Sequence, residues 1–236
     1  MIDINIIYQD LDIIVLDKPS GVIVNKADTT KNEITVQDFL ESKYNFANPT
    51  NSESDFYKRA GIVHRIDKET SGILIAAKNQ MAFENLQAQF KERVVEKTYI
   101  ALAHGHLKQD EGEISAPIGR LPWNRKRFGV MIGGKEATTF YKVIKRLKRP
   151  FTLLELFPKT GRTHQIRVHL KYINHPIFGD EFYAGRKTSR DDRKYLNRFF
   201  LHAKKISFLH PKTGKRVEFE SELPHELKNA LKLLEN

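Results

Sequence analysis

Short apolar runs separated by turn residues are the main pattern along the chain. Residues 2–8 alternate between apolar and polar side chains, and residues 13–16 form a compact apolar run. Both patterns predict β-strands. The turn sequence Asp-Lys-Pro-Ser-Gly at 17–21 leads into another apolar run at 22–24. This arrangement indicates a hairpin between the runs at 13–16 and 22–24.

A longer strand is predicted over residues 95–104. Its two-residue period places Lys97 and Tyr99 on one side and the apolar Ile100 and Leu102 on the other. Further strands are predicted near residue 114 and at 129–132, 138–146, 151–157, 203–209 and 216–220. The last two flank a Pro-Lys-Thr-Gly turn, which predicts a second hairpin.

Helical patterns are confined to four segments, which begin near Thr35, after Asn79, at 161–163 and near Pro224. Thr and Asn are residues that cap helix N-termini. The apolar faces carry Val36, Phe39 and Leu40 in the first helix, Phe83, Leu86 and Phe90 in the second, Ile166, Leu170 and Ile173 in the third, and Leu227, Leu231 and Leu234 in the fourth. A polar stretch at 48–55 is predicted to be a loop.

Strands therefore outnumber helices, and short turns join most of them. This balance favours an α+β fold with a large, mainly antiparallel mixed β-sheet flanked by helices and loops. The sequence contains no long linker, internal repeat or low-complexity segment. A single domain over residues 1–236 is the simplest expectation.

The most informative polar cluster lies at 61–72, which reads Gly-Ile-Val-His-Arg-Ile-Asp-Lys-Glu-Thr-Ser-Gly. The pattern predicts a strand, a loop and a second strand, with Asp67 at the tip of the loop. Arg65 and Lys68 flank this acid, and cationic neighbours favour the ionised form of a carboxylate. Asp67 is thus a candidate reacting group, although an Asp in a turn often only accepts hydrogen bonds from backbone amides.

A second polar cluster, Lys-Thr-Gly-Arg-Thr-His-Gln-Ile-Arg-Val-His, covers residues 159–169. A glycine before a helix start offers backbone amides and the positive end of the helix dipole to a phosphate, and Arg162 adds charge there. Helical spacing places His164, Arg167 and Lys171 on the side opposite the apolar residues. That side is expected to face water or a ligand, and a solvated basic face is the alternative.

These clusters resemble the motifs of the RluA-type pseudouridine synthases. Residues 64–72 are similar to the family signature His-Arg-Leu-Asp-x-x-Thr-Ser-Gly, with Ile66 in place of the usual Leu. In that family the Asp is essential for catalysis, which implies this role for Asp67. Residues 160–169 resemble the third motif, whose Arg pairs with the catalytic carboxylate and corresponds to Arg167. Glu-Lys-Thr-Tyr at 96–99 is similar to the second motif, which implies that Tyr99 lines the pocket beside the target base.

The resemblance implies an isomerase that converts specific uridines to pseudouridine in structured rRNA or tRNA. The N1–C1′ bond breaks, the base turns and C5 joins the sugar, so no cofactor is expected. The target base must leave its stack, and Arg65 resembles the family arginine that fills the vacated space. Four shorter segments, at 17–22, 134–138, 175–180 and 201–203, also resemble the family, although each is less specific than the motifs above. With them the resemblance extends from about residue 10 to about residue 220.

Charge and composition agree with an RNA partner. The chain has 40 Lys and Arg against 29 Asp and Glu, a formal net charge of +11, and a large positive field is common among proteins that bind polyanions. Arg125, Lys126 and Arg127 lie beside Trp123 and could contact phosphates while the indole stacks on a base. An exposed basic turn is the alternative for this segment.

Several classes of protein are disfavoured by what the sequence lacks. It has no cysteine, no Gly-x-x-x-x-Gly-Lys-Ser/Thr loop and no His-Glu-x-x-His or other ligand set with metal spacing, so disulfides, NTP hydrolysis and a metal site are not expected. No apolar run has the length of a membrane span, and the N-terminal residues do not form a secretory signal. These features fit a cytoplasmic protein.

Two other functions are compatible with the same residues. A catalytically idle relative could act as an RNA-binding chaperone, and a nucleoside-cleaving glycosidase would release free uracil. The resemblance is to a stand-alone catalytic domain without an S4 domain, and a monomer is expected. The enzyme hypothesis requires that Asp67, Tyr99 and Arg167 meet in a single basic pocket.

Overall fold

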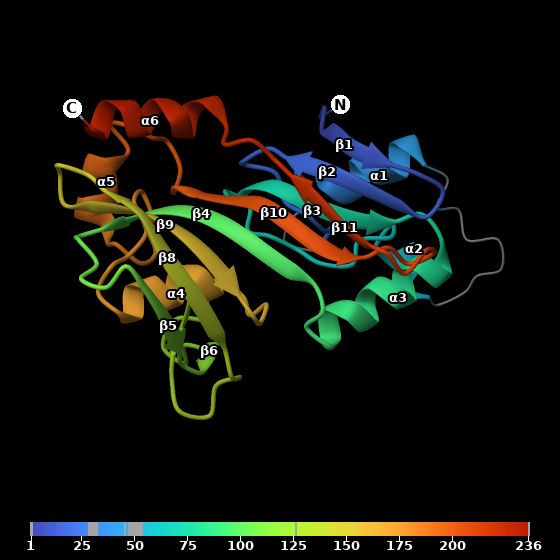
Figure 1. The fold of residues 1–236 in the computed structure, drawn as a ribbon, viewed down its shortest axis with the longest axis horizontal. Helices are drawn as coiled ribbons and strands as arrows, with labels where there is room; N and C mark the ends of the chain where they lie inside the picture. Colours follow the sequence, from blue (N-terminus) through green and yellow to red (C-terminus); the bar gives the residue numbers. More distant parts are fainter. Residues whose placement is uncertain (1, 28–32, 45, 47–53, 126, 236) are drawn as a thin grey trace. The chain divides into compact units, whose positions relative to one another are not determined.

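The computed structural model describes residues 2–27, 33–44, 46, 54–125 and 127–235. The chain forms two compact units, and each contains strands and helices (Figure 1). Unit 1 comprises Met1–Glu96 and Ala203–Glu222, and unit 2 comprises Lys97–His202 and Leu223–Asn236. Neither unit is one continuous piece of chain. The single domain over residues 1–236 stays a prediction.

The sheet of unit 1 has the strand order β1-β2-β3-β10, with β11 paired to β10. The strands are β1 (Asn5–Gln9), β2 (Ile13–Lys18), β3 (Ser71–Ala77), β10 (Leu201–Leu209) and β11 (Arg216–Glu220). The pairs β1–β2, β2–β3 and β10–β11 are antiparallel. β3 is buried along its whole length, and a strand covered on both faces reads as a continuous apolar run.

The helices of unit 1 are α1 (Val36–Lys43), α2 (Asp55–Lys58) and α3 (Gln80–Lys91). Both predicted caps are confirmed. Thr35 Oγ1 accepts from the Asp38 N–H at 3.1 Å, and Asp38 Oδ2 accepts from the Thr35 N–H at 2.9 Å. Asn79 Oδ1 accepts from the Ala82 N–H at 2.9 Å. Most of the loop predicted at 48–55 lies outside the described residues.

The hairpin predicted between 13–16 and 22–24 is wrong. β2 pairs with β1 and β3, and Ile23 makes only an isolated parallel bridge to Thr35. The reason is the fully buried Lys18, whose Nζ donates to the carbonyl oxygens of Pro19 and Val22, each at 2.9 Å. The segment therefore turns around this ammonium group and does not return as a strand.

The sheet of unit 2 has the order β4-β9-β8-β5. Its strands are β4 (Glu96–His104), β5 (Glu111–Ser115), β8 (Thr138–Arg146) and β9 (Phe151–Pro158). All three neighbouring pairs are antiparallel. β6 (Ile118–Arg120) and β7 (Phe128–Val130) form a separate two-stranded sheet. The α+β class with a mainly antiparallel sheet is thereby confirmed.

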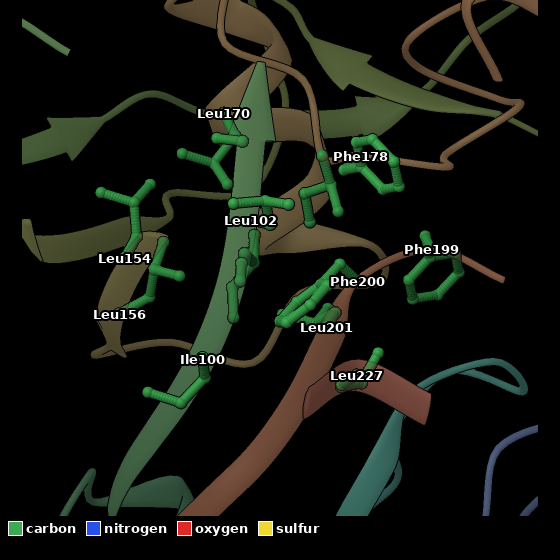
Figure 2. Close-up of a cluster of buried hydrophobic side chains, with 14 of the residues drawn as sticks. Ile100, Leu102, Leu154, Leu156, Leu170, Phe178, Phe199, Phe200, Leu201 and Leu227 are labelled. Carbon is green, nitrogen blue, oxygen red and sulfur yellow. The ribbon is translucent and has the colours of Figure 1, made fainter. Parts of the chain in front are cut away.

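Three helices pack in unit 2, namely α4 (Gln165–Tyr172), α5 (Arg186–Asp192) and α6 (His225–Glu235). The pattern did not predict α5, which carries Arg-Lys-Thr-Ser-Arg-Asp-Asp and has little apolar periodicity. Side chains from β4, β9, α4 and α6 meet in one buried cluster with Phe178 and the segment 199–201 (Figure 2). Among the described residues, no helix is both long enough and apolar enough to cross a membrane.

Candidate active site

Asp67 lies in a turn of unit 1 that leads directly into β3. The strand predicted before it is reduced to one isolated bridge between Ile62 and Ala76, so residues 63–70 form an irregular segment with a turn at 68–69. The carbonyl oxygen of Asp67 accepts from the Thr70 N–H at 3.1 Å, which closes the turn. Asp67 is partly buried and Arg65 is exposed.

A clamp formed by the segment 18–21 holds the residues that follow Asp67. The ammonium group of Lys18 donates to the carbonyl oxygen of Lys68 at 3.0 Å, and the Gly21 N–H donates to the same oxygen at 2.8 Å. The Ser20 hydroxyl donates to the carbonyl oxygen of Glu69 at 2.8 Å. The segment 17–22, which resembles the family, thus supports the Asp67 turn. The sequence pattern of this segment had predicted a hairpin and did not indicate this role.

Two further contacts fix the ends of this segment. His64 Nε2 accepts from the Ile75 N–H at 2.9 Å, and its ring stacks on Phe90 with centroids 4.7 Å apart. At the other end, Gly72 has φ +109°, and a Cβ atom there would lie 2.2 Å from the Ala203 carbonyl oxygen. Only glycine fits at this close approach.

Replacing Lys18 with Met is expected to destabilise the protein and loosen the Asp67 turn. The substitution keeps the length of the side chain but removes the donor for three backbone carbonyl groups, which should lower the free energy of unfolding by about 2–4 kcal/mol. Urea denaturation measures this loss. Lys91→Met, which replaces an exposed lysine of α3, is the control and should change stability by less than about 0.5 kcal/mol. Equal stability of the two variants would contradict the clamp.

Tyr99 and Lys97 lie on the same side of β4, as the two-residue period predicts. Tyr99 is paired with Leu156 of β9 and packs against the core of unit 2. Burial, together with the positive charge of Lys159, lowers the pKa of Lys97 to about 8. The sequence pattern alone did not indicate this lowered pKa of Lys97.

Arg167 is buried in unit 2, where it pairs with Asp180. Its Nε donates to Asp180 Oδ2 at 2.7 Å, and its Nη2 donates to Asp180 Oδ1 at 3.0 Å. Arg167 does not face solvent, because residues 165–170 are all buried, and its predicted pairing with the catalytic carboxylate stays a prediction. The sequence pattern missed Asp180, although it ends the family-like phrase at 175–180.

The other residues predicted near α4 have local environments that differ from that of Arg167. The helix begins at Gln165, and His164 precedes it in the left-handed conformation with φ +55°. His164 Nδ1 lies 2.9 Å from the Tyr183 hydroxyl oxygen. The Arg162 N–H donates to Gln165 Oε1 at 3.0 Å, so one amide of the expected phosphate cradle binds a side chain. Lys171 is exposed.

The predicted phosphate-contacting patch lies between β6 and β7. Trp123 is 81% exposed and Arg125 is also exposed, as a surface that binds RNA requires. The guanidinium carbon of Arg127 lies 5.5 Å from the centroid of the Phe182 ring, and this residue is partly buried. Lys126 falls outside the described residues.

The structure thus assigns the predicted site residues to two units. Asp67 and Arg65 belong to unit 1, whereas Tyr99, Arg167 and the predicted phosphate-binding residues belong to unit 2. Each local environment is defined by the contacts above. The meeting of Asp67, Tyr99 and Arg167 in one basic pocket stays a prediction.

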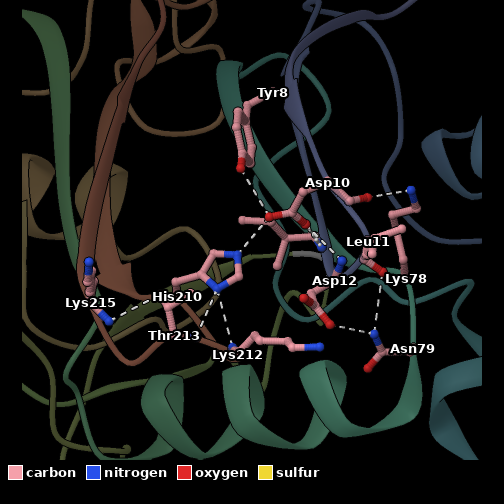
Figure 3. A network of polar contacts seen from close by, with 11 residues as sticks. Tyr8, Asp10, Leu11, Asp12, Lys78, Asn79, His210, Lys212, Thr213 and Lys215 are labelled. Atoms are coloured by element: carbon pink, nitrogen blue, oxygen red, sulfur yellow. Dashed lines mark hydrogen bonds and ion pairs between the residues drawn. The ribbon is translucent and has the colours of Figure 1, made fainter.

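Asp10, Asp12 and His210 are a possible metal-binding group, because one ligand atom from each lies within 4.8 Å of the others (Figure 3). His210 Nδ1 accepts from the Lys212 and Thr213 N–H groups at 3.3 and 3.4 Å. The proton of the neutral ring is therefore on Nε2, which donates to Asp10 Oδ2 at 2.8 Å. Because both ring nitrogens of His210 already take part in hydrogen bonds, the contacts favour a hydrogen-bonded network that stabilises unit 1 over a metal site.

The same network predicts a dependence of stability on pH. Partial burial raises the pKa of Asp10, but hydrogen bonds from the Ile13 and Asp12 N–H groups, His210 and Tyr8 outweigh it and lower the pKa overall. Because the folded-state pKa lies below the unfolded value of about 3.9, the carboxylate stabilises the fold above that pH. This contribution is lost as the pH falls through the folded-state value.

Asp10→Asn should therefore lower the melting temperature at pH 7 and make its decline between pH 5 and pH 3 shallower than in the wild type. A series of thermal melts across this range measures both effects. Parallel declines in the two proteins would show that Asp10 does not contribute.

Comparison with known proteins identifies the family. The model for RNA pseudouridylate synthases matches residues 12–172, a region that includes Asp67, Tyr99 and Arg167. The chain belongs to this family, whose members are RNA pseudouridine synthases and thus isomerases.

Relatives of known name agree with this assignment. The chain is 42% identical over 234 residues to the uncharacterized RNA pseudouridine synthase YlyB of Bacillus subtilis, covering 99% of this chain and 73% of the relative. It is 38% identical to ribosomal large subunit pseudouridine synthase D of Neisseria meningitidis, covering 98% of this chain and 61% of the relative.

A solved structure also matches. Human RNA pseudouridylate synthase domain containing 1 has a TM-score of 0.71 and 29% sequence identity, covering 94% of this chain and 84% of the human one.

Proposed function

We propose that this protein converts specific uridines of structured RNA to pseudouridine, with Asp67 as the essential group and without a cofactor. The observation that carries the proposal is the turn of Asp67. It lies within the region matched by the family model, and three hydrogen bonds from the segment 18–21 to backbone carbonyl oxygens hold the two residues that follow it. A reacting side chain needs such a rigid support.

The chemistry suits a carboxylate. The N1–C1′ bond of the uridine must break, and C5 of the same base must then form a bond to C1′ of the sugar, while C5 loses its proton and N1 gains one. A carboxylate can act as a nucleophile or stabilise positive charge at the sugar carbon, as it does in glycosidases. The atoms of substrate and product are the same, so the reaction needs no redox or energy cofactor.

Tyr99, Arg167 and Arg65 support this reaction in the proposal. The ring of Tyr99 can stack on the uracil, and its hydroxyl can donate a hydrogen bond or transfer a proton. Arg167 directs its guanidinium toward the catalytic carboxylate. The exposed Arg65, two residues before Asp67, occupies the space that the flipped base leaves, which offsets part of the few kcal/mol that extrusion costs.

Basic residues of unit 2 hold the RNA backbone in the proposal. The proposed phosphate contacts come from Arg162, His164, Lys171, Arg125, Lys126 and Arg127. Trp123 adds an exposed ring on which a base can stack.

The name of the Neisseria relative makes large-subunit rRNA the first RNA to test, and tRNA is the second. We also propose that the protein is cytoplasmic and monomeric.

The test is to incubate the purified protein with total RNA and to detect pseudouridine by carbodiimide adducts that resist alkali. The expected result is conversion at a small number of uridines with no release of uracil. Free uracil would instead indicate a glycosidase. RNA binding without either product would indicate an idle RNA-binding module and overturn the proposal.

A further inference from the structure

Arg167 and Asp180 form a deeply buried ion pair in unit 2. Arg167 is 4% exposed and Asp180 is 0% exposed. The carboxylate receives two parallel hydrogen bonds, from Nε at 2.7 Å and from Nη2 at 3.0 Å. This two-point contact fixes the in-plane orientation of the guanidinium, which one hydrogen bond would not do.

Aromatic rings fix the position of the guanidinium plane. The guanidinium carbon of Arg167 lies 4.4 Å from the ring centroid of Phe199, 5.0 Å from that of Tyr183 and 5.7 Å from that of Phe182. Arginine stacks favourably on such rings. Asp180 and the three rings together therefore leave the group little rotational freedom.

Asp180 is itself held by its own turn. Its Oδ1 accepts from the Phe182 N–H at 3.1 Å, and its carbonyl oxygen accepts from the Ala184 N–H at 2.8 Å. The preceding Gly179 has φ +78°, and a Cβ atom there would lie 2.4 Å from the Arg198 carbonyl oxygen. The carboxylate is thus anchored to a hydrogen-bonded turn in which position 179 leaves no room for a side chain.

Asp180 supplies the counter-charge that the buried Arg167 needs. A buried guanidinium without a counter-charge is costly, and Asp180 supplies that charge inside unit 2. The orientation of Arg167 is therefore set within one unit. The edge of the guanidinium that carries Nη1 is the edge that Asp180 does not use.

We propose that Asp180 is a positioning residue for the isomerisation, and that it holds Arg167 so that its Nη1 edge is directed at the catalytic carboxylate, with the Phe199 ring supporting the guanidinium plane. This inference rests on the proposed function. Asp180 does not itself touch the uridine.

The test compares wild type, Asp180→Asn, Arg167→Lys and the double variant in single-turnover conversion of an RNA that the wild type modifies. Asp180→Asn should slow the chemical step by ~10–100-fold, as expected when a catalytic group is misplaced, and should change RNA affinity by less than about twofold. Because Asp180 acts through Arg167, the double variant should be little slower than Arg167→Lys alone. Additive effects on the rate per folded molecule would show that Asp180 acts independently of Arg167.

Asp12→Asn is the matched control, because Asp12 is a buried carboxylate of unit 1 that does not contact Arg167. It should keep the wild-type rate per folded molecule, with the folded fraction measured by circular dichroism. A wild-type rate for Asp180→Asn, additive effects in the double variant, or an equal loss in Asp12→Asn would each overturn the inference. Failure of the wild type to form pseudouridine would instead overturn the proposed function.

If Asp180→Asn does not fold, Phe199→Leu gives a second test. This change keeps the ion pair and most of the apolar volume but removes the closest ring. It should slow the chemical step by at least ~5-fold with RNA affinity unchanged. A wild-type rate would show that the orientation of Arg167 does not limit catalysis.

Discussion

Asp67→Asn is expected to abolish pseudouridine formation and to leave RNA binding nearly unchanged. The amide keeps the size of the side chain and can still accept a hydrogen bond, but it cannot act as a nucleophile or carry the negative charge. Removal of an essential group of this kind typically lowers the rate by about 10⁴-fold or more. The hydrogen bonds that hold the turn run from residues 18–21 to backbone carbonyl oxygens and do not involve the substituted atom.

The measurement is single-turnover conversion of substrate RNA together with the dissociation constant of the complex. Glu69→Gln removes one negative charge two residues away in the same turn and serves as the control, with a rate expected within about threefold of the wild type. A normal rate in Asp67→Asn would show that another group is the catalyst.

Arg167→Ala is expected to remove both activity and a large part of the stability. The sequence resemblance gives one reason, since the arginine of the third motif pairs with the catalytic acid. The structure adds a second, because the substitution leaves the fully buried Asp180 without its two hydrogen bonds from the guanidinium. Breaking a buried ion pair in this way costs about 3–5 kcal/mol.

Denaturant unfolding and single-turnover kinetics separate the two effects. Lys171→Ala on the same helix is the control, since Lys171 is exposed, and its stability should change by less than about 0.5 kcal/mol. If Arg167→Ala had the melting point of the wild type, the importance of its pair with Asp180 would be refuted.

Much of the fold could be predicted from local patterns. The caps at Thr35 and Asn79 follow from side chains that bond the nearest backbone amides. β8 and β9 follow from two-residue periodicity, because burial alternates along most of each strand. These features depend on neighbours within a few residues, which a sequence displays directly.

The errors have a different origin, since they depend on partners distant in the chain. The bend after β2 results from the buried Lys18, which also contacts the carbonyl of Lys68, 50 residues away. Arg167 is buried because Asp180 and Phe199 surround its guanidinium. A helical pattern assigns a charged residue to the solvent side and has no means of locating its counter-charge.

The candidate site shows the same division. The resemblance singled out Asp67, Tyr99 and Arg167 from short motifs. It did not reveal what supports them, namely the clamp of Lys18 on the Asp67 turn and the pairing of Asp180 with Arg167. Such supports lie outside the reacting groups and are visible only through three-dimensional contacts.

The most direct test of the central claim is a pseudouridine map of total RNA from three strains. One carries the wild-type gene, one lacks it, and one carries an Asp67→Asn copy expressed at the same level. The account predicts a small set of uridines that are modified only in the first strain. Restoration of these modifications by the Asp67→Asn copy, or identical maps in all three strains, would contradict it.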